Sequence, residues 1–241
     1  MTNHSDLQKK QCVVEFHLFA DSALFTNPLT KTSGEFCTYQ VPTYSALQGI
    51  MRSIYWKPTL EWRPVSVRIM NPIQMETRCK RLKNYSAPGY DISYYTYLHK
   101  VSYQVRVALE WSNDKNYEQD RNIGKHLSSV DRWIMRGGKR PIFLGIGECI
   151  GYVEPCVFGE GKSYYDNVDM DFGIMFHSFT YANQAYDENT ENALTTNLFN
   201  AKMENGIITF PRAEDTPIKR FIREEKPIWV PVKYTDKPAA D

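Results

Sequence analysis

Lys125 and His126 stand side by side just before a short run of apolar residues at helical spacing. A helix N-terminus exposes unpaired N–H groups and the positive end of the helix dipole, so it attracts anions such as phosphate. An imidazole can move protons near neutral pH, and an ammonium can stabilise negative charge that develops on a phosphate. The pair therefore predicts a phosphate site. A surface charge beside a capping residue is the alternative interpretation.

Further cations follow the pair along the same predicted helix and just beyond it. Arg132 and Arg136 are four residues apart and so share one helical face. Lys139 and Arg140 extend the positive region past Gly137-Gly138. This local cluster predicts contacts with a nucleic-acid backbone, and solvent-exposed ion pairs are the alternative.

A second basic segment is rich in tyrosine. Arg81 and Lys83 precede Tyr94, Tyr95 and Tyr97. Aromatic rings stack on unpaired bases and cations hold phosphates, so this segment predicts contact with RNA. A β-edge with ordinary tyrosine propensity beside a solvated charge run explains the same residues, and both interpretations stay open.

Composition restricts the class of protein without identifying a partner. The 241 residues carry a formal net charge of +1 and are 42% hydrophobic, values typical of a globular protein. Global charge therefore gives no nucleic-acid signal, and only local clusters can carry one. No apolar run is long enough to span a bilayer, and the N-terminus lacks the apolar core of a secretory signal. We expect a cytoplasmic protein with no membrane contact.

The spacing of cysteines and glycines argues against two other kinds of site. The five cysteines are scattered without a CxxC pair, which predicts reduced structural thiols rather than a zinc site. The glycines at 145, 147 and 151 lie within an apolar run rather than at a strand-to-helix turn, so they do not form a dinucleotide motif. We therefore predict neither a bound metal nor a cofactor.

Two amphipathic helices must position the candidate residues. The first begins after Thr43 as N-cap, is stopped by Pro58 and carries Tyr55 at its end. The second follows His126, turns its apolar residues inward and ends at Gly137-Gly138. The inward residues predicted for the second helix are Leu127, Val130 and Ile134.

Strand patterns alternate with these helices. They cover 13–20, 66–74 and 101–111, and a largely apolar strand is expected over 141–158. The resulting β-α-β-β-α-β order predicts an α+β protein with a ferredoxin-like (RRM-like) N-terminal domain over 1–158.

The remainder of the chain has a different pattern. Strand-like runs cover 172–181 and 195–203, and Asn205-Gly206 before 207–210 is a strong hairpin signal. We expect a small antiparallel β domain over 159–241, with a charged C-terminal tail.

Seven stretches, in order, carry a resemblance to a known family. They are FHLFADSALFTNPLTKTSGE (16–35), VPTYSALQGIMRSIYWKPT (41–59), MNPIQMET (70–77), YYTYLHKVSYQV (94–105), DRNIGKH (120–126), FLGIGECIGYVEPCVFG (143–159) and MENGIITFPRAED (203–215). Together they resemble the subtype I-C CRISPR-associated endoribonuclease, a member of the repeat-associated (RAMP) superfamily.

The resemblance implies a function and a site. It implies metal-independent cleavage of the repeat hairpin in CRISPR precursor RNA, after which the protein stays on the 5′ handle of the guide RNA in a surveillance complex (Cascade). It also implies a catalytic set formed by Tyr55 in SIYWKPT and by Lys125 and His126 in GKH. The chain departs from the family at an N-terminal extension and at the SAPGYD loop (86–91).

We therefore expect an endoribonuclease that uses the RNA's own 2′-hydroxyl as nucleophile. Such a reaction needs a base, a cation for the charge on the phosphorane and an acid for the departing 5′-oxygen. The expected partners are the CRISPR repeat RNA, its crRNA 5′ handle and other subunits of a type I-C complex. Two alternatives stay open: a non-catalytic subunit that clamps the guide's 5′ end, and a general nucleic-acid-binding protein that also takes duplex DNA.

Overall fold

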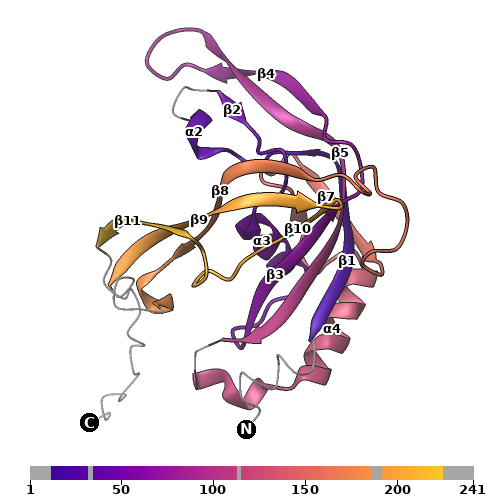
Figure 1. Cartoon of the computed structure of the whole chain (residues 1–241). Coiled ribbons are helices and arrows are strands. Elements are labelled where there is room, and N and C mark those ends of the chain that lie inside the picture. Colours follow the sequence, from indigo (N-terminus) through magenta and orange to yellow (C-terminus); the bar gives the residue numbers. More distant parts are fainter. Residues whose placement is uncertain (1–11, 32–34, 113–114, 186–191, 225–241) are drawn as a thin grey trace, which may run out of the picture. The chain divides into compact units, whose positions relative to one another are not determined.

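The computed structural model describes residues 12–31, 35–112, 115–185 and 192–224 (Figure 1). These residues form two compact units. The first contains those up to Met175 together with Asn200–Pro211, and the second contains Phe176–Phe199 and those from Arg212 onward. The predicted division into domains 1–158 and 159–241 stays a prediction.

Four antiparallel strands form the centre of the first unit. They are β1 (Val13–Ala23), β3 (Leu60–Ile69), β5 (Tyr90–Trp111) and β7 (Ile150–Pro155). Their order in the sheet is β3-β5-β1-β7. The register pairs Phe16 with both Val105 and Pro155, and all three of these strand pairs are antiparallel. Alternate residues of β1 and β5 are buried, so one face of the sheet forms a wall of the core.

Two helices pack on this sheet through apolar stripes. α3 (Tyr44–Ile54) begins at Thr43, whose side chain accepts a hydrogen bond from the amide of Ala46, so the predicted N-cap is confirmed. α3 contacts β3, and α4 (Ile123–Met135) contacts β7 and β1. The buried residues of α4 are His126, Val130 and Ile134, so His126 takes the position predicted for Leu127, which is only half-buried. His126 is therefore a core residue.

Shorter elements extend the first unit. β4 (Met75–Lys83) and the N-terminal half of β5 form a hairpin that projects beyond the four central strands (Figure 1). β2 (Phe36–Cys37) pairs in parallel with β5, and β6 (Ile142–Phe143) pairs with β7. The short helices are α2 (Pro28–Lys31) and the 3₁₀ helix η1 (Lys115–Asp120).

The predicted hairpin at Asn205-Gly206 is confirmed. β10 (Ile207–Thr209) pairs with the C-terminal end of β9 (Ala193–Glu204) and also with β3. Asn205 and Gly206 have φ angles of 50° and 77°, as the two central residues of a type I′ turn require.

The second unit is also antiparallel. β8 (Met170–Thr180) and β9 continue into it from the first unit, and β9 pairs there with β11 (Ile218–Glu224). Asn197 is fully buried and donates hydrogen bonds to the hydroxyls of Ser178 and Thr180. A single 3₁₀ turn, η2 (Ala182–Gln184), is the helical element among this unit's described residues. The predicted tail beyond Glu224 lies outside the described residues.

Two strand predictions differ from the structure. β3 ends at Ile69, whereas the pattern predicted a strand over 66–74. The apolar run 141–158 is interrupted between β6 and β7. Gly145 in that gap has a φ of 100°, and a Cβ there would lie 1.8 Å from the carbonyl oxygen of Leu24, so the chain turns tightly against the segment after β1.

At the level that the structure establishes, the fold is a mostly antiparallel sheet with few helices. No helix in the described part of the chain is long and apolar enough to cross a membrane.

Candidate active site and nucleic-acid interface

The N-terminus of α4 carries Lys125 and His126 in its first turn. Asn122 is the N-cap, and its side-chain oxygen accepts a hydrogen bond of 3.0 Å from the amide of Lys125. The asparagine satisfies one of the unpaired amides of the first turn and thereby fixes where the helix starts. The start of the helix then determines that His126 points into the core while Lys125 stays on the surface.

Tyr55 is held at the opposite side of the site by the end of α3. Its backbone is extended, with φ −159° and ψ 130°, and its amide donates to the carbonyl of Met51. Its own carbonyl accepts a 2.7 Å hydrogen bond from the indole of Trp62. Both backbone groups are therefore engaged, and the tyrosine ring has a defined direction.

Tyr55 and His126 meet in one buried chain of hydrogen bonds. The Tyr55 hydroxyl lies 3.0 Å from Nδ1 of His126, and Nε2 of His126 lies 2.8 Å from the backbone carbonyl of Asp120. His126 is 0% exposed and Tyr55 is 4% exposed. Trp111 packs edge-on against the imidazole, with ring centroids 5.9 Å apart. Residues 71 positions apart in the sequence thus come into direct contact.

Asp120 links the surface residue of the trio to the buried pair. Its Oδ1 forms an ion pair with Nζ of Lys125, and its Oδ2 lies 3.7 Å from Nε2 of His126. The Lys125 ammonium lowers the pKa of Asp120, and the carboxylate raises the pKa of Lys125. Asp120 was missing from the sequence-based candidates, although it belongs to the DRNIGKH stretch on which the resemblance rests.

The predicted basic residues of α4 and of the turn after it lie on the surface. Arg132, Arg136, Lys139 and Arg140 are all exposed. The amides of Lys139 and Arg140 donate hydrogen bonds to the carbonyls of Ile54 and Ser53, so the chain here runs beside the residue that precedes Tyr55. Among the described residues, none of the four cations takes part in an ion pair.

The β4–β5 hairpin separates the predicted tyrosines onto two faces. Its register pairs Cys79 with Tyr94, Arg81 with Ile92 and Lys83 with Tyr90, and opposite residues share a face. Arg81, Lys83, Tyr90, Ile92 and Tyr94, which we call the exposed hairpin face, are all exposed. Tyr94 is 51% exposed, and the Arg81 guanidinium lies over the Tyr90 ring at 4.0 Å.

Tyr95 and Tyr97 point to the other face of this hairpin. The Tyr95 ring stacks on Phe36, with centroids 4.6 Å apart, and the ammonium of Lys80 lies 4.3 Å from its centre. Tyr97 is 1% exposed, and its hydroxyl donates to Glu148 at 3.2 Å. Tyr97 therefore offers no ring surface for stacking in this structure, and Tyr95 is already stacked on a protein ring.

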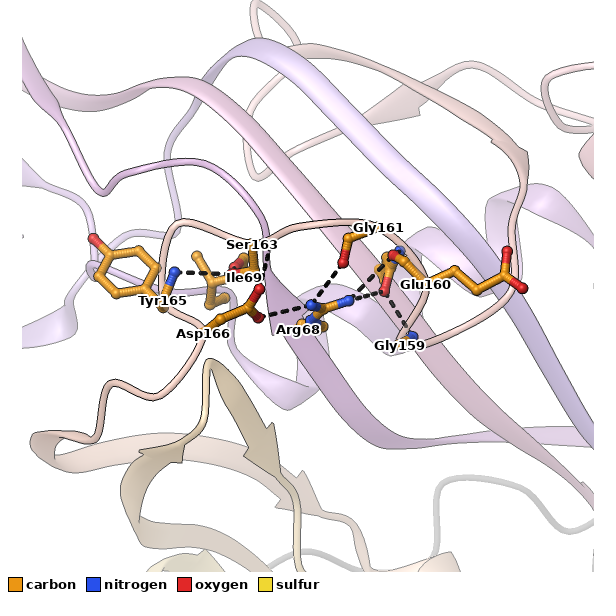
Figure 2. Close-up of polar contacts among 9 residues, drawn as sticks. Arg68, Ile69, Gly159, Glu160, Gly161, Ser163, Tyr165 and Asp166 are labelled. Carbon is orange, nitrogen blue, oxygen red and sulfur yellow. Dashed lines mark hydrogen bonds and ion pairs between the residues drawn. The ribbon is translucent and has the colours of Figure 1, made fainter.

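A buried arginine fastens the loop after β7 onto the sheet (Figure 2). The Arg68 guanidinium donates to the carbonyls of Glu160 and Gly161 and forms a 2.7 Å ion pair with Asp166. Gln104 of the neighbouring strand donates to the same Glu160 carbonyl at 2.7 Å. The dashed lines in Figure 2 join the polar atoms of this cluster to one another. Buried polar groups that satisfy one another in this way are typical of a structural support.

No three His, Cys, Asp or Glu side chains within the described ranges gather in a way that could hold a metal ion. The five cysteines all lie in the described ranges, and they form no disulfide there.

Comparisons with known proteins identify related chains. A sequence model of the family described as CRISPR-associated protein (Cas_Cas5) matches residues 13–211. The CRISPR pre-crRNA endoribonuclease Cas5d of Mannheimia succiniciproducens is 23% identical over 246 residues, which cover 86% of this chain and 98% of that protein.

Two solved structures share both fold and sequence with this chain. A crystal structure described as a CRISPR-associated protein is 32% identical with a TM-score of 0.70. A functionally uncharacterized protein from Streptococcus mutans is 35% identical with a TM-score of 0.69. Each match covers 86% of this chain and 96% of the other chain.

Proposed function

The chain belongs to the CRISPR-associated Cas5d family, and from this premise we propose that it is an endoribonuclease that cleaves CRISPR precursor RNA within its repeat. The observation that carries the proposal is the family match over 13–211, together with the activity for which the Mannheimia relative is named. The contact between Tyr55 and His126, with Lys125 alongside, supports the assignment of the catalytic set to these three residues.

The proposed reaction needs no metal ion, because RNA supplies its own nucleophile. The 2′-hydroxyl attacks the adjacent phosphorus, the 5′-oxygen leaves, and a cyclic phosphate remains. Proton transfer by a positioned side chain contributes roughly 10²–10⁴-fold to the rate of such a step. The Tyr55–His126 pair supplies a proton-transfer group, and the exposed ammonium of Lys125 supplies the positive charge for the phosphorane.

The proposed fold of the N-terminal part is ferredoxin-like. In that fold, the four strands of a β-α-β-β-α-β unit form an antiparallel sheet with the third strand between the first two and the fourth beside the first. The order β3-β5-β1-β7, with α3 after β1 and α4 after β5, supports this assignment. We retain the functional division into 1–158 and 159–241 as part of the proposal.

The proposed RNA path follows the exposed cations. Arg132, Arg136, Lys139 and Arg140 would contact phosphates, because all four are exposed and the last two lie next to the end of α3. On the hairpin, Arg81, Lys83 and Tyr94 would contact a single-stranded part of the RNA. After cleavage the protein would stay on the crRNA 5′ handle with other subunits of a type I-C surveillance complex, as the family resemblance implies.

Incubation of the purified protein with its cognate repeat RNA in EDTA tests this function directly. We expect one discrete cut and a product that ends in a 2′,3′-cyclic phosphate or its opened form. A repeat RNA with a single 2′-deoxy nucleotide at the cut should bind with nearly unchanged affinity and stay intact. Cleavage of the 2′-deoxy substrate would point to an activated water and contradict the proposed nucleophile.

A second candidate function is a non-catalytic clamp on the guide's 5′ end. The burial of both Tyr55 and His126 favours it, since a hydrogen-bonded pair with almost no exposed surface also serves a purely structural role. Tight binding of the repeat RNA without any product, in EDTA and in Mg²⁺ alike, would select the clamp.

A further inference from the structure

His126 has no direct route to a substrate in this structure. Its side chain is 0% exposed, Trp111 covers one side of the ring, and both ring nitrogens already have partners. A proton that His126 gives or takes must therefore pass through one of the atoms that touch its nitrogens.

The partner of Nε2 determines which nitrogen can exchange a proton. That partner is the backbone carbonyl of Asp120, at 2.8 Å, and a carbonyl oxygen can only accept a hydrogen bond. Nε2 therefore carries a hydrogen both in the neutral and in the protonated imidazole. The exchangeable position is Nδ1, and its neighbour at 3.0 Å is the hydroxyl of Tyr55.

We propose that the Tyr55 hydroxyl, and not the imidazole, is the group that exchanges a proton with the RNA, and that His126 acts through it as a positioning residue and proton acceptor. This inference rests on the proposed endoribonuclease function. The Asp120 carbonyl has a part in it as well, because it holds the imidazole in the tautomer whose lone pair faces Tyr55.

The proposed step conserves atoms and charge. As the 2′-oxygen bonds to phosphorus, its proton moves to the Tyr55 oxygen while the Tyr55 proton moves to Nδ1 of His126. The bond from phosphorus to the 5′-oxygen breaks, and the 5′-oxygen takes a proton from water. The imidazolium then returns its proton, through Tyr55, to the hydroxide that remains.

Single-turnover cleavage at saturating RNA tests whether Tyr55 and His126 act in one relay, with Tyr55 next to the RNA. The variants are Tyr55→Phe, which keeps the ring in its packing, His126→Gln, which keeps a donor and an acceptor but cannot store a proton, and the double variant. We expect each single variant to lose roughly 10²–10⁴-fold in rate. The double variant should lose no more than the worse single variant, because both substitutions interrupt one relay.

Three controls accompany this cycle. RNA affinity and melting temperature, measured on each variant, separate loss of chemistry from loss of fold. Tyr117→Phe removes a phenol from neighbouring η1, where Tyr117 is 40% exposed, and should leave the rate unchanged. The pH–rate profile adds a readout that packing alone does not change. The limb of the profile that disappears in His126→Gln is assigned to the imidazole, and it should also disappear in Tyr55→Phe.

Direct contact between His126 and RNA gives different results. Tyr55→Phe would then keep much of the rate and the imidazole limb, and the losses of the two single variants would multiply in the double variant. Either result overturns the relay while wild-type cleavage still supports the proposed function.

The tautomer is measurable without any cleavage. Nitrogen NMR of histidine-labelled protein, assigned with His126→Gln, should show the proton of neutral His126 on Nε2. A proton on Nδ1 overturns the relay whether or not the protein cuts RNA. A wild-type protein that leaves the repeat intact instead overturns the proposed function, and the catalytic part of this inference with it.

Discussion

The carboxylate of Asp120 is paired with the ammonium of Lys125, and a phosphate that binds Lys125 has to compete with this contact. Lys125 lowers the pKa of Asp120, so the carboxylate is charged at neutral pH and repels a second anion. Asp120 is therefore a residue at which the charge of the site can be adjusted without changing the Tyr55–His126 hydrogen bond, because His126 contacts the Asp120 backbone carbonyl.

Asp120→Asn should strengthen RNA binding. The amide removes a negative charge beside Lys125 and keeps the backbone carbonyl, so we expect affinity to rise roughly two- to fivefold at low salt, the size of effect typical of an exposed ion pair. Filter binding or fluorescence anisotropy at several salt concentrations measures it. Asp131→Asn, which removes an exposed carboxylate from α4, is the matched control. An equal rise in both variants would show that only net charge matters.

Lys125→Ala should weaken both binding and cleavage. An exposed ammonium that contacts the scissile phosphate acts in the ground state and in the transition state, so we expect the rate to fall by about 10²–10³-fold and affinity to fall as well. The Tyr55 and His126 variants should change the rate alone, since their groups act on protons. Lys162→Ala, at an exposed lysine of the loop after β7, serves as the control. Normal affinity in Lys125→Ala would remove this residue from the phosphate contact.

Elements determine which of the predicted nucleic-acid contacts remain available. The strand alternation of the β4–β5 hairpin puts Tyr94 on its exposed face and Tyr97 in the core, although the two residues are close in sequence. Helix α4 keeps all its predicted cations on the surface, because its buried stripe is occupied by His126, Val130 and Ile134.

Tyr94→Ala should lower RNA affinity, whereas Tyr97→Ala should lower folding stability. Loss of the exposed Tyr94 ring should cost about 1–3 kcal/mol of RNA affinity per stacked base and leave the melting temperature unchanged. Truncation of the buried Tyr97 should cost about 3–5 kcal/mol of folding stability, as for other large aromatic residues in cores. Affinity and thermal unfolding, measured on both proteins, distinguish the two. A Tyr94→Ala protein that binds RNA normally would remove the hairpin from the RNA path.

Substitution of both Arg132 and Arg136 by glutamine should weaken binding to many RNA sequences alike. If the two arginines contact phosphates, the slope of log affinity against log salt should become shallower by about 0.7 per lost contact for a single strand. The matched control replaces Lys202 and Arg220, two exposed cations on β9 and β11. An unchanged slope in the α4 variant would mean that these arginines face only solvent.

At the scale of the whole molecule, the Arg68 cluster connects chain segments that are distant in sequence. Arg68 lies on β3, and its partners Gly161 and Asp166 are more than 90 positions away. The guanidinium is almost fully buried, so its removal would leave the two carbonyls and the carboxylate without their donor. We expect this cluster to contribute to the stability of the first unit rather than to RNA chemistry.

The Arg68–Asp166 ion pair should make folding stability depend on pH in the acid range. Arg68 lowers the pKa of Asp166 in the folded protein. A carboxyl group with a lowered folded pKa stabilises the fold above its unfolded pKa, near 4, and this contribution is lost as the pH falls through the folded pKa. Urea unfolding of wild type should therefore lose more stability between pH 7 and pH 3 than that of Asp166→Asn. Asp215→Asn is the control, and equal losses in all three proteins would contradict the prediction.

The sequence by itself determined the main alternation of strands and helices and the identity of the family, and it proposed Tyr55, Lys125 and His126 for the site. Thr43 as N-cap and Asn205-Gly206 as hairpin turn were predictable because each acts on neighbours in the chain. The family was predictable because matching stretches are a property of the sequence, and the comparison over 13–211 confirms it. The bounds of β3 and β7 were predicted less well, since a bulge at 64–66 and the close approach of Gly145 to Leu24 depend on segments distant in the sequence.

Only the tertiary structure decided how the site residues relate to one another. Apolar periodicity along α4 is satisfied by a stripe through Leu127 or by one through His126, and the packing of the helix on β7 and β1 selected His126. The same packing brought His126 against Tyr55 and against the carbonyl of Asp120. No pattern in the sequence encodes these contacts, because they join three segments whose distance and direction are set by the packing of α3 and α4 on the sheet.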